Sequence, residues 1–412
     1  MLALRIAFCY LVLFSVYIAD DIARIIIFGV WNADSTPFPI PLLHVAIPWV
    51  GKHLGLVVTV FTNGSGDTTY DWILVLFNLI LATAAGSGWF IFSRKCKKTP
   101  RLYAWLRLLA RIVLAAILLL YGFDKVIPAQ FGVLTPSRLS EPLGLLTPMG
   151  MLWTFMAASH GYTMLTGYTE VIGGLLLLFP RTAILGAIIG FVALANVLAL
   201  DIFYDVPAKL LTFQLLVLDL FLLSHDSRAL VNLLVLRRNA VPLAMPVIPT
   251  TPYARKAIMA ATWLLTIAYC LTLVTISARS YSRDLASVDS KTPLYGVWLV
   301  DDFTLLPINT RTDTGRWERL AFDSATRLSL EIDGQTYRNT VAVDGVKHTL
   351  SISDAFNPSW KAAASYKEIS AGVLKLRGEV NGVPFTAKIR RMDLAGFELT
   401  KWRLHLISEY PH

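Results

Sequence analysis

Long apolar runs occupy the first two-thirds of this 412-residue chain and restrict its fold more than any other feature. About 20 apolar residues of helix cross the hydrocarbon core of a bilayer, and seven runs approach or reach that length. These runs are Leu2–Ala19, Trp72–Phe92, Tyr103–Phe123, Met164–Phe179, Thr182–Phe203, Ala208–Ser224 and Ala257–Ile276. We therefore expect a polytopic α-helical membrane bundle of about seven spans. Tyr17 is too bulky for a signal-peptide cleavage site after Ala19, so we expect the first helix to be retained.

The composition fits a lipid environment, because 55% of the residues are hydrophobic and only 16% are charged, against about 25% charged in soluble domains. The net charge of +9 lies mainly in the apolar part. Before Arg279 there are 19 Lys and Arg against 12 Asp and Glu, and from Arg279 onward 18 against 16. Basic clusters between apolar runs are typical of cytoplasmic loops. They do not indicate a phosphate-binding surface, so we expect no nucleic-acid partner.

The same basic loops predict the orientation of the chain. Arg94–Arg101, Arg181 and Arg228–Lys256 all fall on the inner side if the N-terminus lies in the cytoplasm. Aspartates dominate the opposite loops. With seven spans, this pattern predicts a multi-pass protein of a bacterial-type inner membrane, with its C-terminal domain in the periplasm.

Two segments on the expected outer side are long. Pro39–Phe61 is apolar but interrupted by prolines and a glycine, so we expect a re-entrant or interfacial element, with an eighth span as the alternative. Pro128–Thr163 carries aromatic residues suited to the membrane interface, and together the two segments could roof the outer mouth of the bundle. On the inner side, Arg228–Arg238 is amphipathic and is expected to lie along the membrane surface.

From Leu294 onward the apolar residues alternate with period two, which predicts an all-β domain. Arg327–Ile332 precedes Asp333-Gly334, Thr336–Val343 precedes Asp344-Gly345, and Leu374–Val380 precedes Asn381-Gly382. Asp-Gly and Asn-Gly favour the positive φ angles of type I′ turns, so each pair predicts a two-residue hairpin. Successive hairpins predict an antiparallel meander that closes into a barrel.

The chain is thus expected to have four parts. Residues 1–101 hold the first membrane helices and a long outer loop, and residues 102–238 form a four-helix membrane bundle. Residues 239–278 form a cytoplasmic linker and the last membrane helix, and residues 279–412 form the extracytoplasmic barrel.

The ends of the barrel sequence resemble the lipocalin pattern. Gly296-Val297-Trp298 opens the first predicted strand, and Lys401-Trp402-Arg403 falls in the last one. In lipocalins this Trp closes one end of an eight-stranded barrel. Small barrels of this type hold one lipophilic ligand or are packed solid, and the sequence leaves both alternatives open.

Ionisable side chains inside the membrane are costly and are therefore candidates for function. Glu170 lies in Gly167–Gly174, a segment whose small residues allow a neighbouring helix to approach closely. Lys125 lies at the outer end of the third apolar run, at a similar depth. An ion pair between Glu170 and Lys125 would partly offset the cost of burying each charge. Such a pair would act as a structural pin between helices, as a proton relay or as an anchor for a polar ligand.

Other polar residues near the expected outer side complete the candidate set. The candidate ligand-binding residues are Lys125, Glu170, Asp205, Lys209, His160 and Asp67. Asp205 and Lys209 share one helical face if a helix begins near Asp205. Asp67 lies in the glycine-rich stretch Asn63–Asp71, where Asp67 or Thr68 would suit a helix N-cap.

The remaining polar positions carry weaker expectations. Asp219 lies deep in an apolar run and should face the bundle interior, and Gly186–Gly190 predicts a helix-packing face. Arg107 and Arg111 share one helical face and could meet lipid phosphate. No Cys or His cluster has the spacing of a metal site, and no Cys-x-x-Cys pair is present. We therefore expect neither a metal nor a thiol redox centre.

Three short motifs lie between about Leu106 and Leu230. They are Gly122-Phe123-Asp124-Lys125, the segment Glu170–Leu177 and Phe179-Pro180-Arg181-Thr182. This stretch resembles the DoxX-like family of bacterial membrane proteins, which shows Gly-x-x-Lys after its first helix and Glu-x-x-Gly-Gly-Leu-Leu-Leu in its second. The resemblance implies a four-helix membrane bundle. Some relatives are linked to quinone-coupled sulfur oxidation, and others to membrane redox complexes or stress responses. The additional helices and the β domain depart from the minimal family plan.

These observations favour a binding or accessory protein that holds the head group of a quinone or lipid at the outer side of the membrane. The barrel would bind the same molecule, or a membrane or periplasmic partner protein. The alternative is a subunit of a quinone-coupled membrane oxidoreductase in which Glu170 moves the proton and another chain supplies the electrons. A transporter would show inverted repeats and broken helices, and neither is evident.

Overall fold

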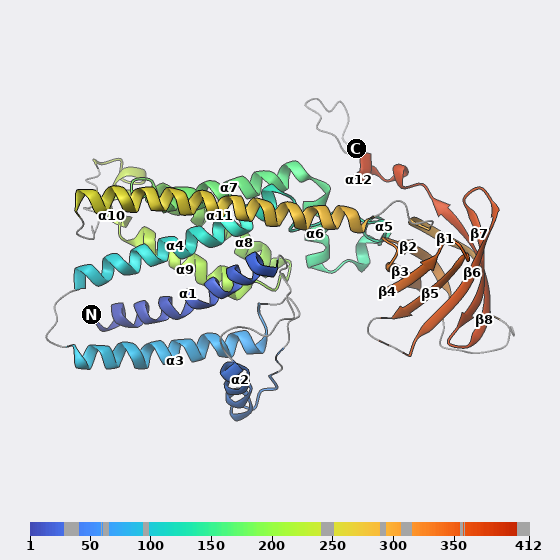
Figure 1. The fold of residues 1–412 in the computed structure, drawn as a ribbon, viewed down its shortest axis with the longest axis horizontal. Coiled ribbons are helices and arrows are strands. Elements are labelled where there is room, and N and C mark those ends of the chain that lie inside the picture. Colours follow the sequence, from blue (N-terminus) through green and yellow to red (C-terminus); the bar gives the residue numbers. More distant parts are fainter. Residues whose placement is uncertain are drawn as a thin grey trace. The chain divides into compact units, whose positions relative to one another are not determined.

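The computed structural model describes residues 1–28, 41–58, 60, 66–93, 99–239, 251–288, 294–305, 315–354, 357 and 359–401. The chain divides into two compact units. The helical unit comprises Met1–Gln130 and Gly161–Ser280, and the barrel unit comprises Phe131–His160 and Tyr281–His412. The predicted fold class, a bundle of apolar helices followed by a closed antiparallel β-barrel, is confirmed (Figure 1).

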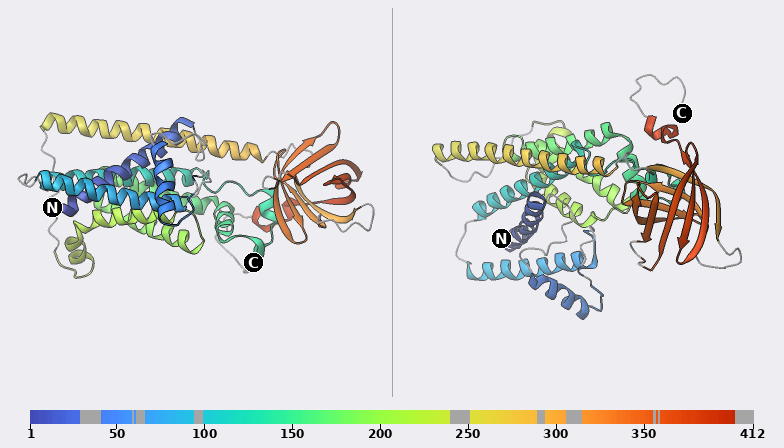
Figure 2. Two further views of the ribbon diagram at one scale, coloured as in Figure 1. Left: turned by 90° about the horizontal axis from the view of Figure 1, so that it is seen from below. Right: turned by 45° about the vertical axis from the view of Figure 1, so that its right-hand side comes forward.

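The helices of the helical unit are α1 (Leu2–Phe28), α2 (Pro41–His53), α3 (Thr69–Phe92), α4 (Thr99–Val126), α7 (His160–Leu178), α8 (Ala183–Phe203), α9 (Lys209–Ser224), α10 (Ser227–Leu234) and α11 (Pro252–Ser287). The long helices lie lengthwise beside one another (Figures 1 and 2). α1, α3, α4, α8 and α11 are each long and apolar enough to cross a membrane. α9 and α10 together form a further candidate that bends by 77° between the two helices. The chain is therefore a membrane protein.

Two of the predicted membrane elements need more comment. α7 has 19 residues, but polar residues in its first half keep its mean hydropathy below that of the other spans, and its membrane crossing stays a prediction. α2 has 13 residues with Pro48 inside it. A helix of that length rises only about 20 Å, too short for a hydrocarbon core of about 30 Å. This length favours an interfacial or re-entrant α2 over an eighth span.

α4 is the centre of the helical unit. In its apolar window 61% of the residues are buried, whereas the other long helices range from 11% to 28%. The core around it includes the fully or almost fully buried Leu114, Leu118 and Leu119. α7 and α8 pack through glycines, because a Cβ on Gly186 would lie 2.6 Å from the backbone nitrogen of Leu177. The predicted small-residue packing face at Gly186–Gly190 is therefore confirmed.

The barrel unit contains eight strands, each antiparallel to the next, and β8 closes on β1. The strands are β1 (Gly296–Leu305), β2 (Trp317–Phe322), β3 (Arg327–Ile332), β4 (Gln335–Asp344), β5 (Thr349–Asp354), β6 (Lys361–Ser370), β7 (Val373–Val380) and β8 (Val383–Met392). Its short helices are α5 (Pro136–Ser140), η1 (Leu143–Leu145), α6 (Pro148–Ala158), η2 (Leu394–Gly396) and α12 (Glu398–Lys401).

Two of the three predicted hairpin turns are confirmed, and one is wrong. Asp333-Gly334 and Asn381-Gly382 have positive φ at both positions and join neighbouring strands directly. The loop after Asp344 is longer, because its carboxylate accepts hydrogen bonds from the backbone nitrogens of Val346 and Lys347. The positive φ in that loop falls on His348 instead of on the Asp-Gly pair.

The interior of the barrel is packed with side chains. Trp317, Phe322 and Phe385 are almost completely buried, and the rings of Phe303, Trp317 and Phe385 contact one another. Small residues on β6 and Leu, Ile and Val from the other strands fill the rest of the core. The solid-packed alternative thus describes this barrel better than a lipophilic cavity.

The lipocalin-like end of the barrel is formed differently from our expectation. Trp298 does lie in β1, is buried, and donates its indole N–H to the carbonyl of Leu294. The late basic residue over its ring is Arg391, at 6.0 Å from the ring centroid. Lys401 lies in α12, after the last strand, and Trp402 and Arg403 lie outside the described residues. The placement of Lys401 in the last strand is therefore wrong.

The segment between α4 and α7 belongs to the barrel unit. Ser137, in α5, donates hydrogen bonds from its backbone nitrogen and its hydroxyl to the carboxylate of Asp323. Arg319, in β2, donates to the carbonyl of Ser140 and lies 3.4 Å from the carboxylate of Glu331. These contacts fix α5 on the outside of the barrel at β2. The role of this segment as a roof over the bundle stays a prediction.

Candidate functional site

Lys125 and Glu170 form the ion pair that we expected from their similar depth in the predicted membrane helices. The Lys125 Nζ lies 2.8 Å from both carboxylate oxygens of Glu170, and both residues are buried, at 6% and 4% exposure. The two helices can approach because a Cβ on Gly167 would lie 2.7 Å from the carbonyl oxygen of Gly122. The glycines of α4 and α7 thus set the distance at which this pair forms.

A second group of charges lies where α9 begins. The Asp67 carboxylate accepts hydrogen bonds from the backbone nitrogens of Lys209 and Leu210, at 2.9 and 2.8 Å. It therefore caps α9, a helix that begins 142 residues later. Its negative charge also interacts favourably with the positive N-terminal end of the helix dipole. The Lys209 Nζ lies 2.8 Å from Asp205 and 3.7 Å from Asp67.

One expectation about this group changes, and the expected N-cap at Asp67 or Thr68 is confirmed at Thr68. α9 begins at Lys209, and Asp205 lies before it with a φ of 53°, so the Asp205–Lys209 pair forms across a turn and not along one helix. The N-cap of α3 is Thr68, which forms a reciprocal capping box with Asp71. Asp67 serves another helix instead. Asn63–Ser65, the beginning of the glycine-rich stretch, lies outside the described residues.

Asp201 links the two groups electrostatically. It is buried in α8 and accepts a 2.7 Å hydrogen bond from the hydroxyl of Thr212 in α9. Asp201 lies within electrostatic range of Asp67, Lys125 and Lys209. We call the set Asp67, Tyr121, Lys125, Glu170, Asp201, Asp205, Lys209 and Thr212 the polar cluster. The sequence does not single out Asp201, because no pattern around it indicates that Thr212, in the next helix, is its hydrogen-bond partner.

Aromatic and hydroxyl groups complete the surroundings of the ion pair. The Lys125 Nζ lies 5.7 Å from the centre of the Tyr121 ring, an arrangement that favours a cation. The neighbouring Asp124 is buried and accepts a 2.9 Å hydrogen bond from Ser277 of α11. Asp124, the residue before Lys125, thus joins α4 to the last long helix, α11.

Asp219 faces the bundle interior, as predicted, and is fully buried. Its carboxylate lies against Gly190 of α8, whose added Cβ would meet an Asp219 oxygen at 3.0 Å. Neither oxygen has a hydrogen-bond partner among the residues that the structure describes. Since a buried carboxylate without a partner is costly, Asp219 is a second polar position of interest, deeper in the bundle than Lys125.

Arg107 and Arg111 bind backbone carbonyls at the ends of other helices. Arg111 donates hydrogen bonds to the carbonyls of Leu177 and Leu178, at the end of α7. Arg107 donates to the carbonyl of Leu222, at the end of α9. Cations at helix C-termini satisfy the last carbonyls and the helix dipole. Contact of these arginines with lipid phosphate stays a prediction.

His160 lies in the other unit. It is exposed at the beginning of α7, and its ring contacts Tyr281 edge to face, with the ring centroids 6.3 Å apart. Within the described parts of the chain, no group of three His, Cys, Asp or Glu residues could hold a metal ion. The groups available in the polar cluster are ion-pairing and hydrogen-bonding ones. They can bind an anionic or hydroxylated head group or carry a proton on a carboxylate.

A comparison with curated protein sequences finds similarity to an uncharacterised bacterial protein. The chain is 36% identical to "Uncharacterized protein YwoB" of Bacillus subtilis (strain 168) over 118 residues, which cover 29% of this chain and 75% of that protein. No family model matches the chain. No solved structure matches it either.

Proposed function

The chain belongs to the family of the uncharacterised Bacillus subtilis protein YwoB. We propose that it is a membrane-embedded accessory protein that binds a lipophilic molecule. The molecule is a quinone or a lipid, and its polar head group would be held by the polar cluster. The family supplies no activity for this chain, so the proposal rests on the residues themselves. The lipid bilayer is the first partner, and a membrane or periplasmic protein is a further one.

The buried Lys125–Glu170 pair is the observation that carries this proposal. Desolvating two charges costs more than a well-packed apolar pair of similar volume would, and this cost is larger within a membrane. The pair therefore needs a reason other than stability. Charged groups beside Tyr121, Asp201 and Lys209 can donate and accept hydrogen bonds to the oxygens of a quinone or a lipid head group.

The resemblance to the DoxX-like family supports the same reading. Lys125 and Glu170 are the charged residues of the two motifs that carry this resemblance. The Lys125 Nζ lies 2.8 Å from the Glu170 carboxylate, so the two motifs lie next to each other in the fold. With the N-terminus in the cytoplasm, α4 ends and α9 begins at the outer side, so the polar cluster would face the periplasm of a bacterial-type inner membrane. The barrel would lie on that side.

The test is mass spectrometry of lipophilic molecules that co-purify with the full chain in mild detergent. We expect about one molecule of a quinone or a lipid per chain, and loss of most of it from Glu170→Gln. The matched control is Glu141→Gln, the same change in an ion pair of the barrel unit, which should retain the molecule. Equal retention by both variants, with unchanged stability, would remove Glu170 from the binding site.

A quinone-coupled oxidoreductase subunit is the second candidate function. It is favoured by the position of Glu170, a carboxylate beside Tyr121 and other buried acids along which a proton could move. The electrons would come from another chain. A co-purified quinone that membranes reduce in the presence of the wild-type chain, but much more slowly with Glu170→Gln, would support this candidate. A bound phospholipid would support the accessory protein.

A further inference from the structure

Three lysines form a row across the outside of the barrel. Lys367 of β6 lies directly opposite Lys375 of β7, which lies directly opposite Lys388 of β8. Their side chains point outward, because their neighbours in each strand, such as Leu374, Leu376 and Ile389, fill the core. Adjacent strands are about 4.8 Å apart, so the three lysines occupy neighbouring backbone positions across a width of about 10 Å.

This row is unfavourable for the barrel alone. Like charges directly opposite each other on neighbouring strands are destabilising. Among the residues that the structure describes, none of the three lysines forms an ion pair. Asp302 lies opposite Lys388 in register, yet it is not within ion-pairing distance. The nearby Arg390, in contrast, is paired with Asp301 at 3.1 Å. An uncompensated row of this kind points to a partner that supplies the negative charge.

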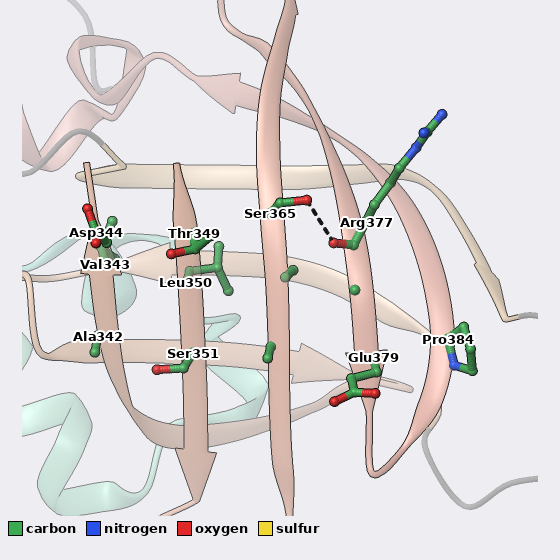
Figure 3. A pocket seen from close by; sticks show the side chains of 13 residues that line it. Ala342, Val343, Asp344, Thr349, Leu350, Ser351, Ser365, Arg377, Glu379 and Pro384 are labelled. Atoms are coloured by element: carbon green, nitrogen blue, oxygen red, sulfur yellow. Dashed lines mark hydrogen bonds between the residues drawn. The ribbon is translucent and has the colours of Figure 1, made fainter. Parts of the chain in front are cut away.

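A hollow adjoins the lysine row. It has a volume of about 720 Å³ and is open to solvent. One register row at its floor runs through the small outward side chains of Ala342, Ser351 and Ala363 and continues to Glu379 and Pro384. The next row carries Asp344, Thr349, Ser365 and Arg377 (Figure 3). In register it lies between the floor and the lysines. Small side chains on neighbouring strands leave room for a protruding side chain of another protein, which a flat lipid surface would not provide.

Among the described elements that flank the barrel, α5 lies away from β6. α5 packs on β2 through Ser137 and Arg319, as described above. In a closed barrel of eight strands, β6 is four strands from β2 in either direction and therefore lies on the opposite side. A partner could reach β6, β7 and β8 without displacing α5.

We infer that the outer face of β6–β8 binds an acidic segment of a partner protein. Its carboxylates would pair with Lys367, Lys375 and Lys388, and a side chain next to them would enter the hollow. This interaction concerns the barrel alone and does not depend on the ligand of the polar cluster. The barrel would thus be a docking module for a protein in the compartment that the barrel faces.

The test uses the full chain in phosphatidylcholine nanodiscs and a fluorescein-labelled decapeptide of alternating Glu and Ala. Fluorescence anisotropy should show binding that weakens as salt is added, and no binding of the Gln-Ala counterpart. The row variant, with Lys367→Glu, Lys375→Glu and Lys388→Glu, should bind the acidic peptide at least about tenfold more weakly. The control variant, with Arg316→Glu, Arg327→Glu and Arg338→Glu, has the same change in charge at exposed positions outside the row and outside the hollow. It should bind nearly as wild type.

Several results would overturn the inference. Equal weakening in the row and control variants would mean that only net charge matters. Binding of phosphatidylglycerol vesicles or inorganic polyphosphate, without binding of the acidic peptide, would exclude a protein partner. The neutral variant with Lys367→Gln, Lys375→Gln and Lys388→Gln should unfold at the same or a higher temperature, because it removes repulsion. A fall in its unfolding temperature would assign the row to the stability of the barrel.

Discussion

At the scale of single residues, the Lys125–Glu170 pair separates a structural pin from a binding site. Removing one partner leaves an unpaired buried charge and should lower the free energy of unfolding by about 3–5 kcal/mol. Lys125→Met combined with Glu170→Met should restore most of that stability, because two apolar side chains replace the pair. Thermal unfolding in detergent of the two single variants and the double variant measures this coupling.

The double variant also tests function. If the pair anchors a head group, the double variant should regain stability but should still lose the co-purified molecule. Recovery of both properties together would show that the pair only joins α4 to α7. The two readouts thus distinguish a polar anchor from a pin without relying on a destabilised protein.

Asp219 should limit the stability of the bundle. Its buried carboxyl has no hydrogen-bond partner in the part of the chain that the structure describes, and such a group costs about 1–3 kcal/mol. Asp219→Ala should therefore raise the unfolding temperature, even though it leaves a small void. Asp201→Ala, the same change at a carboxylate that accepts from Thr212, should lower it. A marked loss of stability in Asp219→Ala would reveal a partner such as bound water.

At the scale of helices, glycines determine how closely α4 and α7 pack. An added Cβ at Gly167 would meet backbone atoms of Gly122 and Val126 at 2.7 Å, so the helices must separate. Gly167→Ala should cost about 1–3 kcal/mol of stability and should weaken retention of the ligand, because Lys125 moves relative to Glu170. Gly88→Ala is the matched control in α3, where nothing lies within 4 Å. It should be neutral or slightly stabilising. Equal effects of the two substitutions would contradict this packing.

The elements differ in how well the sequence predicts them. Local patterns were sufficient for the long helices and for the turns at Asp333-Gly334 and Asn381-Gly382, since hydropathy and positive φ are properties of neighbouring residues. The loop after Asp344 was not predictable in this way, because its side chain accepts hydrogen bonds from the loop backbone. The cap of α9 by Asp67 joins residues 142 positions apart, and nothing in either segment marks the other.

At the scale of the whole molecule, the apolar runs and the C-terminal part with period-two alternation fall in two different compact units. Membership of residues 131–160 in the barrel unit depends on contacts such as that of Ser137 with Asp323, which join distant segments and leave no periodic pattern. The candidate site was partly predictable, because intramembrane charges are rare and two of them pair. Asp201 and Arg391 were missed as partners because their roles depend on Thr212 and Trp298 in other elements.

The most direct test of the central claim is an electron cryomicroscopy map of the full chain in nanodiscs made with native lipids. If the polar cluster holds a head group, the map will show non-protein density whose polar end lies within hydrogen-bonding distance of Lys125, Glu170, Asp201 or Lys209. The account is contradicted if these side chains are surrounded by protein alone, with no space for a ligand, or if Lys125 and Glu170 point into the acyl chains.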